Sequence, residues 1–160
     1  MQNLKRVLFI GRFQPFHLGH LSVIEEIDNR ADVKEIVIGV GSSQYDNTEE
    51  NPYSYDIREE MIIRNLYRKI KKPYKIIAIP DIHNNNLWVD HVTDIVGETN
   101  EVYTGNKWVA NLFKEKEYIV KPVKIKIKIT GTQLRKMIKD KDDSWKNFVS
   151  SKIYNLISHE

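Results

Sequence analysis

Two histidines, His17 and His20, lie three residues apart in the segment Gly11–His20, which reads GRFQPFHLGH. Residues at this spacing face the same side of a helix, so the two side chains would present their imidazole donors together. If a helix begins beside them, its first backbone amides also lack partners within the helix. Imidazoles and amides at a helix amino end favour a bound anion, and the pattern therefore predicts a phosphate site.

The flanking sequence predicts the elements that such a site needs. The apolar run Val7–Ile10 has the length and branching of a buried strand, and apolar residues recur at helical spacing over Leu21–Ile27. Gly11 suits the turn off the strand, and Pro15 fits the loop or the first helical turn because it needs no amide partner there. We therefore expect a strand, a turn and a helix, with the histidines where the helix starts.

Two other interpretations of the histidine pair remain open at this point. The pair could supply two ligands of a zinc site. The chain has no cysteine, however, and His83 or His91, which are distant in the sequence, would have to supply further ligands. The pair could also be ordinary polar residues at a helix start.

The pattern His-x-Gly-His after a first strand resembles the signature of the nucleotidyltransferase superfamily of adenylyl- and cytidylyltransferases. Within it, the whole segment Gly11–His20 resembles the archaeal-type nicotinamide-nucleotide (NMN) adenylyltransferases. Residues 129–135, ITGTQLR, are similar to the superfamily's second motif, with Thr130 where serine is commoner. Segments 41–44, 51–54, 85–88 and 103–106 also look like those enzymes. The resemblance spans most of the chain and weakens after about residue 140.

Strands and helices alternate along the rest of the chain. Further strands are predicted at 35–40, 76–79 and 101–103, and helices at 54–71, 88–96 and from the cap residue Asn106 to Phe113. Such alternation predicts a parallel sheet flanked by helices, whose ligands gather at the carboxyl ends of the strands. The resemblance implies a three-layer, Rossmann-like α/β nucleotidyltransferase fold. We expect a single domain over 1–160, ending in a short helical segment at about 143–160.

Composition is that of a small soluble protein. The chain has 160 residues, 41% of them apolar, and a net charge of only +3, which gives no strong case for nucleic acid as a partner. It has no cysteine and no long apolar stretch, so we expect a cytoplasmic protein without disulfides or membrane contact. Lys124–Ile129 alternates lysine with isoleucine, which predicts an edge strand with its lysines in solvent. The alternative is that this row of lysines binds polyphosphate or RNA.

The resemblance implies adenylyl transfer from ATP to NMN, giving NAD and pyrophosphate. The chain has no cysteine nucleophile, Gly-x-Ser-x-Gly elbow or Walker loop, so direct attack by the NMN phosphate on the ATP α-phosphorus is expected, without a covalent enzyme intermediate. Arg135 follows Thr132 by three residues on a predicted helix, so its guanidinium can return toward an anion at that helix's amino end. The expected catalytic residues are Arg12, His17, His20 and Arg135. The expected ATP-binding residues are Gly11, Arg12, Phe13, His17, Gly19, His20, Gly105, Asn106, Thr130, Gly131, Thr132 and Arg135.

By the same resemblance, Asn85 contacts the carboxamide of NMN and Trp88 stacks on its ring. Without the family, Trp88 is more often a core residue and Asn85, within the run Asn84–Asn86, more often a turn residue. Magnesium is implied as the cofactor, bound mainly through the ATP phosphates rather than by protein ligands. A homo-oligomer, with a hexamer as the family's pattern, is also implied.

Two alternative functions remain. The first is an adenylyltransferase of the same fold acting on another phosphate, such as phosphopantetheine or flavin mononucleotide. The second is a non-catalytic nucleotide-binding sensor. The choice between nicotinamide and nicotinic acid mononucleotide stays open, and residues 45–47, YDN, depart from a stretch that often contains histidine in archaeal relatives.

Overall fold

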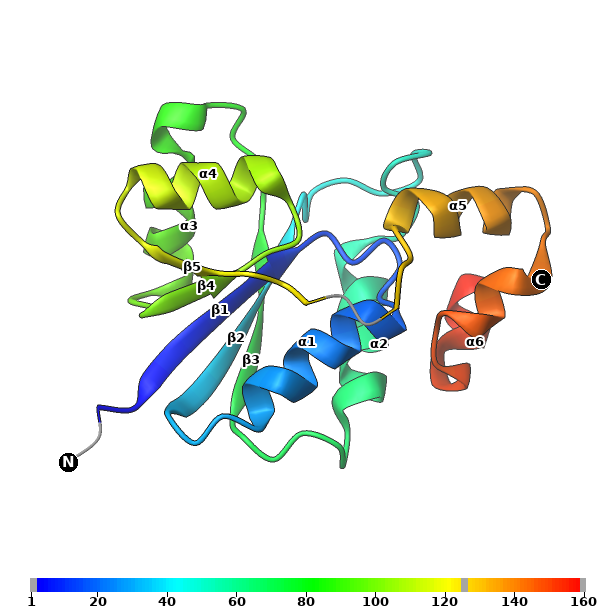
Figure 1. The fold of residues 1–160 in the computed structure, drawn as a ribbon. Coiled ribbons are helices and arrows are strands. Elements are labelled where there is room, and N and C mark those ends of the chain that lie inside the picture. The colour runs from blue at the N-terminus through cyan, green and yellow to red at the C-terminus, as the bar shows by residue number, and fades with distance from the viewer. Residues whose placement is uncertain (1–2, 125–126, 159–160) are drawn as a thin grey trace.

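The structure is a computed structural model that describes residues 3–124 and 127–158. Five parallel strands form one sheet in the order β3-β2-β1-β4-β5 (Figure 1). The strands are β1 (Lys5–Gly11), β2 (Val33–Gly41), β3 (Tyr74–Ile79), β4 (Glu101–Tyr103) and β5 (Ile119–Lys121). The chain runs outward from β1 to β3 and then returns to place β4 on the other side of β1. The carboxyl ends of β1 and β4 therefore border the crevice where ligands bind in sheets of this kind.

Helices cover both faces of the sheet. They are α1 (Leu18–Asp28), α2 (Tyr55–Leu66), α3 (Asn85–Val96), α4 (Lys107–Glu115), α5 (Gly131–Lys139) and α6 (Tyr154–Ile157), with two short 3-10 segments, Asp143–Asn147 and Ser151–Ile153. Successive β1 side chains point to opposite faces, so Val7 and Phe9 enter one core and Leu8 and Ile10 the other. This arrangement confirms the three-layer α/β prediction.

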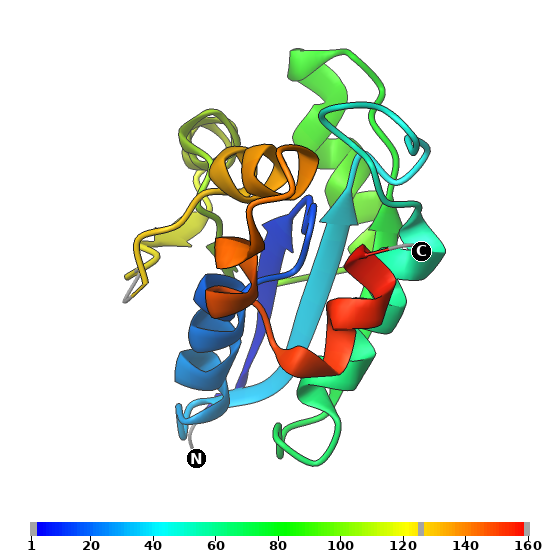
Figure 2. The same cartoon turned by 90° about the vertical axis from the view of Figure 1, so that its right-hand side faces the viewer.

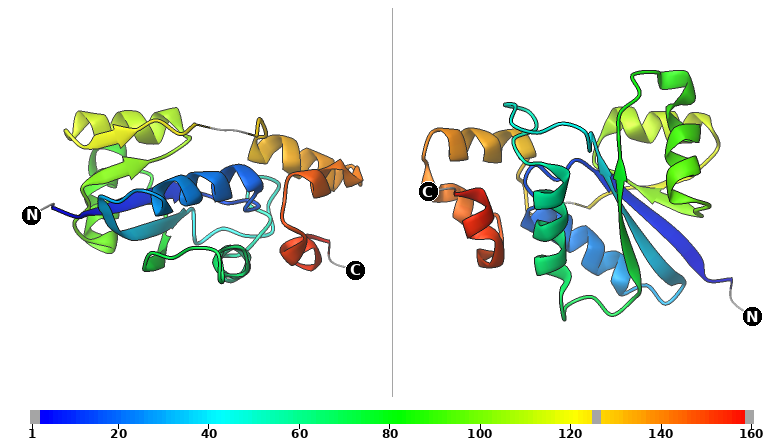
Figure 3. Two further views of the ribbon diagram at one scale, coloured as in Figure 1. Left: turned by 60° about the horizontal axis from the view of Figure 1, so that its bottom comes forward. Right: turned by 180° about the vertical axis from the view of Figure 1, so that it is seen from behind.

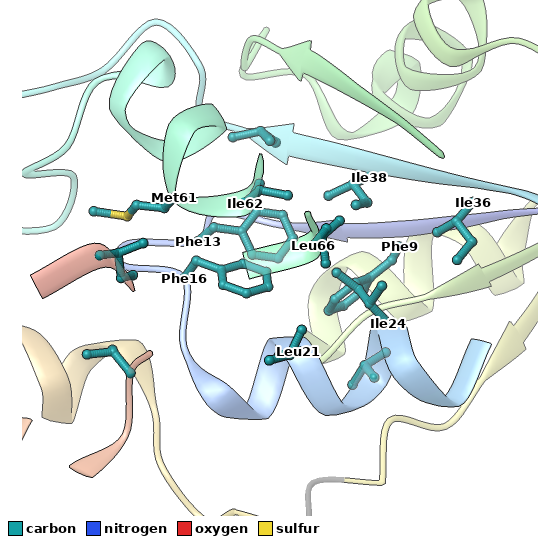
Figure 4. Packing of buried hydrophobic residues seen from close by; sticks show 14 of the residues in the cluster. Phe9, Phe13, Phe16, Leu21, Ile24, Ile36, Ile38, Met61, Ile62 and Leu66 are labelled. Carbon is teal, nitrogen blue, oxygen red and sulfur yellow. The ribbon is translucent and has the colours of Figure 1, made fainter. Parts of the chain in front are cut away.

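The first core lies between the sheet and α1, α2 and the carboxyl-terminal segment (Figure 4). Phe13 and Phe16, which precede α1, lie in it between Phe9 and the α2 residues Met61 and Ile62. The second core packs α3 and α4 against the other face. After α5, the chain passes alongside α1 and α2, where the Leu18 amide donates to the Phe148 carbonyl at 2.8 Å (Figure 2).

Several predicted element ends are wrong. The helix predicted to reach Lys71 ends at Leu66, because Arg68 adopts a left-handed φ of 59° that a right-handed helix cannot continue. Ile70 suggested the longer helix, and it instead packs on the first core from the loop. Conversely, α3 begins three residues before the predicted Trp88, since the Asn84 side chain caps the amide of Asn86.

The edge strand predicted at Lys124–Ile129 is also wrong where the structure describes it. Lys124 and residues 127–129 carry no strand pairing, while Ile125 and Lys126 lie outside the described residues. Ile127 and Ile129 pack on the first core, because the chain here crosses from the sheet edge to α5. The edge strand is β5, which pairs with β4.

Across residues 3–124 and 127–158, none of the helices combines the length and the apolar character needed to cross a membrane.

Candidate active site

A cavity of about 690 Å³ opens at the carboxyl ends of the strands. Its lining comes from the loops that follow β1, β2, β3 and β4 and from the amino ends of α1 and α5. Figures 1 and 3 show α3 and α4 on one side of this end of the sheet and α5 on the other. Its size is within the roughly 300–1,000 Å³ that is typical of small-molecule sites.

His17 and His20 lie at the start of α1 and bond to each other's backbone. The His17 Nδ1 accepts from the amides of Gly19, at 3.0 Å, and His20, at 3.3 Å, and the His20 Nδ1 accepts from the His17 amide at 3.1 Å. The two rings stack with centroids 3.6 Å apart. Because each Nδ1 is an acceptor, each neutral ring carries its proton on Nε2, which is left to donate.

Burial keeps both rings neutral. It lowers the pKa of His17 to about 4. Phe9, Phe13 and Phe16 surround the His20 ring with centroids 4.7 to 6.2 Å away, and burial, followed by the neighbouring His17, lowers the pKa of His20 well below its usual value. Both residues line the cavity, and neither Nε2 has a hydrogen-bond partner within the described ranges. At neutral pH the pair therefore offers the cavity two Nε2–H donors without a net charge.

One part of the phosphate-site prediction is wrong. The first amides of α1 are not free, because the Gly19 and His20 amides bond to the His17 ring, the Leu18 amide to the Phe148 carbonyl and the Leu21 amide to the His17 carbonyl. A histidine N-cap satisfies the amides that a helix start normally leaves open. At α1 the donors for an anion are thus the imidazoles alone.

The amino end of α5 has the free amides that α1 lacks. Thr130 and Gln133 form a reciprocal cap, in which the Gln133 amide donates to Thr130 Oγ1 at 3.1 Å and the Thr130 amide to Gln133 Oε1 at 2.9 Å. Among the described residues, the amides of Gly131 and Thr132 have no hydrogen-bond acceptor, and both residues line the cavity. These two amides and the helix dipole favour an anion at this point.

Arg135 folds back over the start of its own helix, as predicted. Its Nη1 donates to the Gln14 carbonyl at 3.0 Å and its Nη2 to Thr132 Oγ1 at 3.2 Å. A Cβ at Gly131 would lie 2.8 Å from this Nη1, so the guanidinium keeps this position only beside a glycine and would have to shift next to an alanine. The bond to Gln14 joins the second motif to the first across 121 residues of sequence.

A buried arginine that the sequence analysis missed supports the loops after β1 and β2. The Arg58 side chain is fully buried, and its guanidinium donates to the carbonyls of Arg12, Gly41 and Ser42 at 2.8 to 3.1 Å and of Ser54 at 3.3 Å. Burial lowers the pKa of Arg58 to about 10, so it remains a cation at neutral pH. Its position on the apolar face of α2, four residues before Ile62, was the signal that could have found it.

Arg12 itself lies at the cavity with an exposed side chain. Burial, and then the neighbouring Arg12 charge, lower the pKa of Arg135, which places the two guanidinium groups in one electrostatic environment. Gln14, also buried, exchanges hydrogen bonds of 2.9 Å with the Tyr53 backbone and so ties the loop before α2 to the same turn. The side of the cavity near α1 and α5 is therefore cationic and rich in donors.

The opposite side, next to α3 and α4, is aromatic and amidic. Asn85 and Trp88 from α3 both line the cavity, and so does Trp108 from α4, which the sequence analysis did not single out. An aromatic residue just past Asn106, the cap that follows β4, was the available signal for it. On the same rim, the Tyr45 hydroxyl bonds to His83 Nε2 at 2.7 Å.

The donor set fits a divalent cation that arrives with a nucleotide. Asp81 is the one carboxylate among the described residues that line the cavity, and its Oδ2 accepts from the Ser42 hydroxyl at 2.7 Å. No group of three histidine, cysteine or acidic side chains positioned for a metal occurs within residues 3–124 and 127–158, so the zinc interpretation gains no support there. Oxygen ligands from phosphates and water suit Mg²⁺ or Mn²⁺ in such a site.

All the residues that the sequence analysis selected line this one cavity. They are Gly11, Arg12, Phe13, His17, Gly19, His20, Asn85, Trp88, Gly105, Asn106, Thr130, Gly131, Thr132 and Arg135.

Comparison with known proteins agrees with this geometry. The model of the cytidylyltransferase-like family matches residues 8–153. The chain belongs to this family. It is 42% identical over 154 residues to the nicotinamide-nucleotide adenylyltransferase of Methanococcus aeolicus, covering 95% of this chain and 87% of that one. The enzyme of the same name from Thermoplasma volcanium is 41% identical over 162 residues, covering 98% of this chain and 89% of the relative.

Solved structures share the fold at lower identity. A bifunctional NMN adenylyltransferase/ADP ribose pyrophosphatase from Francisella tularensis, complexed with AMP and a manganese ion, has a TM-score of 0.68 at 23% identity. The match covers 93% of this chain but only 44% of that longer protein. The nicotinic acid mononucleotide adenylyltransferase of Plasmodium falciparum has a TM-score of 0.59 at 14% identity, covering 96% and 94% of the two chains.

Proposed function

We propose that this protein transfers the adenylyl group of ATP to nicotinamide mononucleotide, producing NAD and pyrophosphate. The observation that carries the proposal is the meeting of two distant motifs in one cavity, where Arg135 bonds to the Gln14 carbonyl at 3.0 Å. The similarity to relatives of this activity over nearly the whole chain supplies the choice of substrate.

The reaction joins one oxygen of the NMN phosphate to the α-phosphorus of ATP. The bond from that phosphorus to the oxygen bridging it to the β-phosphate breaks, and pyrophosphate leaves with the electron pair. The attacking phosphate is already ionised at neutral pH, so no base has to remove a proton. The protein must therefore position two anions and stabilise the charge that develops on the phosphoryl oxygens.

The neutral histidines suit this task. The Nε2–H groups of His17 and His20 donate to the oxygens of the reacting phosphates, and their Nδ1 atoms hold both rings in place through the α1 cap. Arg12 balances the negative charge at the mouth of the cavity. Because the rings are fixed before substrate arrives, little reorganisation accompanies the charge change.

The leaving pyrophosphate lies at the amino end of α5. The amides of Gly131 and Thr132 and the guanidinium of Arg135 hold its oxygens there. Asp81, the one carboxylate among the described residues that line the cavity, would face a divalent cation that arrives with the triphosphate, and Mg²⁺ in that role would neutralise part of the phosphate charge. The ring end of NMN then lies at α3 and α4, where Asn85 binds its carboxamide and aromatic side chains face the pyridinium.

The test is pyrophosphate release from ATP and Mg²⁺ with each of four acceptors: nicotinamide mononucleotide, nicotinic acid mononucleotide, flavin mononucleotide and phosphopantetheine. We expect release with the nicotinamide substrate, together with NAD identified by chromatography. Release with flavin mononucleotide or phosphopantetheine alone would show that the acceptor is a different phosphate, while adenylyl transfer by this fold would stand. Release with none of the four would overturn the proposal in favour of a binding module.

A further inference from the structure

Tyr45 and His83 form a hydrogen-bonded pair at the rim of the cavity. The Tyr45 hydroxyl lies 2.7 Å from His83 Nε2. The His83 residue lines the cavity, whereas the half-buried Tyr45 does not. The other ring nitrogen, His83 Nδ1, has no hydrogen-bond partner among the described residues. The imidazole is therefore held at one nitrogen and leaves the second for a ligand.

The loop that carries His83 is fixed to the neighbouring loop after β2. The Gln44 side chain bonds to the Asp81 backbone twice, accepting from the amide and donating to the carbonyl, each at 2.9 Å. The Ser42 hydroxyl donates to Asp81 Oδ2 at 2.7 Å. His83 itself has a left-handed φ of 55°, which is uncommon for a residue other than glycine. Backbone held in such a conformation beside a cavity is typical of functional sites.

The position of His83 matches the ring end of a bound mononucleotide. His83 lies two residues before Asn85, where α3 begins, and both residues line the cavity. Arg135 belongs to α5 on the other side of the cavity (Figure 1). Because phosphates bind on that cationic side, the ring of a mononucleotide and its substituent extend toward His83 and Asn85.

The bonded pair can present either a donor or an acceptor to a ligand. A tyrosine hydroxyl can donate to an imidazole nitrogen or accept from it. When Tyr45 donates to Nε2, the neutral His83 ring carries its proton on Nδ1 and can donate to a carboxylate. When Tyr45 accepts from Nε2–H, Nδ1 is unprotonated and can accept from the NH2 group of a carboxamide. These two substituents distinguish nicotinic acid mononucleotide from nicotinamide mononucleotide.

We propose that His83 is a specificity-determining residue that hydrogen-bonds the ring substituent of the acceptor through Nδ1, with Tyr45 as the positioning residue that holds its ring. The inference rests on the proposed function and adds a second recognition group beside Asn85. Exchange of the proton between the two ring nitrogens lets this group meet a carboxamide or a carboxylate without a change in the backbone.

The first test compares His83→Asn with His83→Asp, because asparagine and aspartate have nearly the same shape and both tolerate a left-handed φ. The measured quantity is the ratio of kcat/KM for nicotinamide mononucleotide to kcat/KM for nicotinic acid mononucleotide. A carboxylate at this position repels the carboxylate of the second acceptor. The ratio should therefore be about ten- to a hundredfold higher in His83→Asp than in His83→Asn. Equal ratios in the two variants would overturn the inference.

Asn86→Asp is the matched control, because the exposed Asn86 lies three residues after His83 and does not line this cavity. It introduces the same charge and should change the ratio less than twofold. A change as large as that in His83→Asp would mean that the charge acts at long range, and it would overturn the contact.

Tyr45→Phe tests the support of the ring. It should lower kcat/KM for both acceptors about three- to tenfold and leave the KM for ATP unchanged. In a double-mutant cycle with His83→Asn, the same substitution should have almost no further effect. A full additional loss in the double variant would overturn the positioning role of Tyr45.

The last test does not depend on turnover. Calorimetry measures the Kd of each mononucleotide in the presence of a non-hydrolysable ATP analogue. The ratio of the two Kd values should differ between His83→Asp and His83→Asn by a factor similar to that in kcat/KM. If the native enzyme forms no dinucleotide but this difference in binding remains, the proposed function fails and the contact of His83 stands. If the native enzyme forms NAD and the two variants bind both mononucleotides alike, the proposed function stands and the inference fails.

Discussion

The close approach of the His17 ring to Gly19 predicts what an alanine at this position would do. A Cβ built there would lie 2.8 Å from His17 Cε1 and 2.9 Å from His17 Nδ1, closer than unbonded atoms approach. The His17 ring is held by bonds to two amides and is stacked on His20 with centroids 3.6 Å apart, so the added Cβ has to push it out toward the cavity that it lines. Gly19→Ala should therefore expel the imidazole from its capping position and break its bonds to the Gly19 and His20 amides.

The effects on stability and on catalysis should differ. Loss of a side-chain cap costs about 0.5–2 kcal/mol, while alanine gains up to about 1 kcal/mol over glycine within a helix. The free energy of unfolding should thus change by only about 1 kcal/mol, or roughly 2–4 °C in Tm. The reaction, in contrast, loses a fixed hydrogen-bond donor, which elsewhere lowers kcat about 100- to 1,000-fold.

The assay is a double-mutant cycle of Gly19→Ala and His17→Ala, with kcat from pyrophosphate release and stability from denaturant unfolding. If the alanine acts by displacing the ring, it should have almost no further effect on kcat once His17→Ala has removed that ring. A second full loss of kcat in the double variant would refute the reasoning. So would a Gly19→Ala variant with native kcat.

Three further predictions concern other parts of the site. Arg135→Lys should raise the KM for ATP about tenfold with little change in Tm. The Arg135 guanidinium bonds to Gln14 and Thr132 and can still bind an anion, whereas a single ammonium group cannot make all of these contacts at once. A KM for ATP equal to that of the native enzyme would contradict this prediction. Arg58→Met should lower the free energy of unfolding, measured by urea denaturation, by at least about 3 kcal/mol, because three buried carbonyls lose their charged donor. A smaller loss would contradict the role of Arg58 in holding the loops after β1 and β2. Stability should fall as the pH drops from about 6.5 to 4, because burial lowers the pKa of folded His17 to about 4 and the unfolded chain takes up the proton first. His17→Asn, a cap that does not titrate, should lessen that fall, and an equal fall would refute the assignment.

The sequence predicted the parts of the fold that depend on local pattern. The buried run Val7–Ile10 and the cap at Asn106 appear where they were expected. The end of α2 did not, because Ile70 continues the apolar spacing while Arg68 turns the chain away. Apolar periodicity reports that a residue packs inward, and it does not distinguish a helix from a loop that packs on the same core.

Long-range contacts explain what was missed in the site. The four carbonyls around Arg58 belong to two connections, the one after β1 with Arg12 and the one from β2 to α2 with Gly41, Ser42 and Ser54. Of these residues only Ser54 lies close to Arg58 in the sequence. The exposure of Trp108 likewise depends on how α4 sits against Trp88. Residue types predicted which chemistry the cavity would carry, whereas its supporting contacts required the tertiary structure.

The glycines of the two motifs share one physical role that their spacing alone did not reveal. At Gly19 the absent Cβ makes room for the His17 ring, and at Gly131 it makes room for the Arg135 guanidinium, each at 2.8 Å. In both cases a functional side chain folds over the first turn of its own helix. At α1 the His17 ring accepts hydrogen bonds from the first amides, so the donor left for a ligand is the imidazole Nε2–H. At α5 the Arg135 guanidinium lies beside the Gly131 and Thr132 amides and leaves them free. One helix start therefore offers neutral donors and the other a positive charge, which suits transfer at a phosphorus at the first and departure of pyrophosphate at the second.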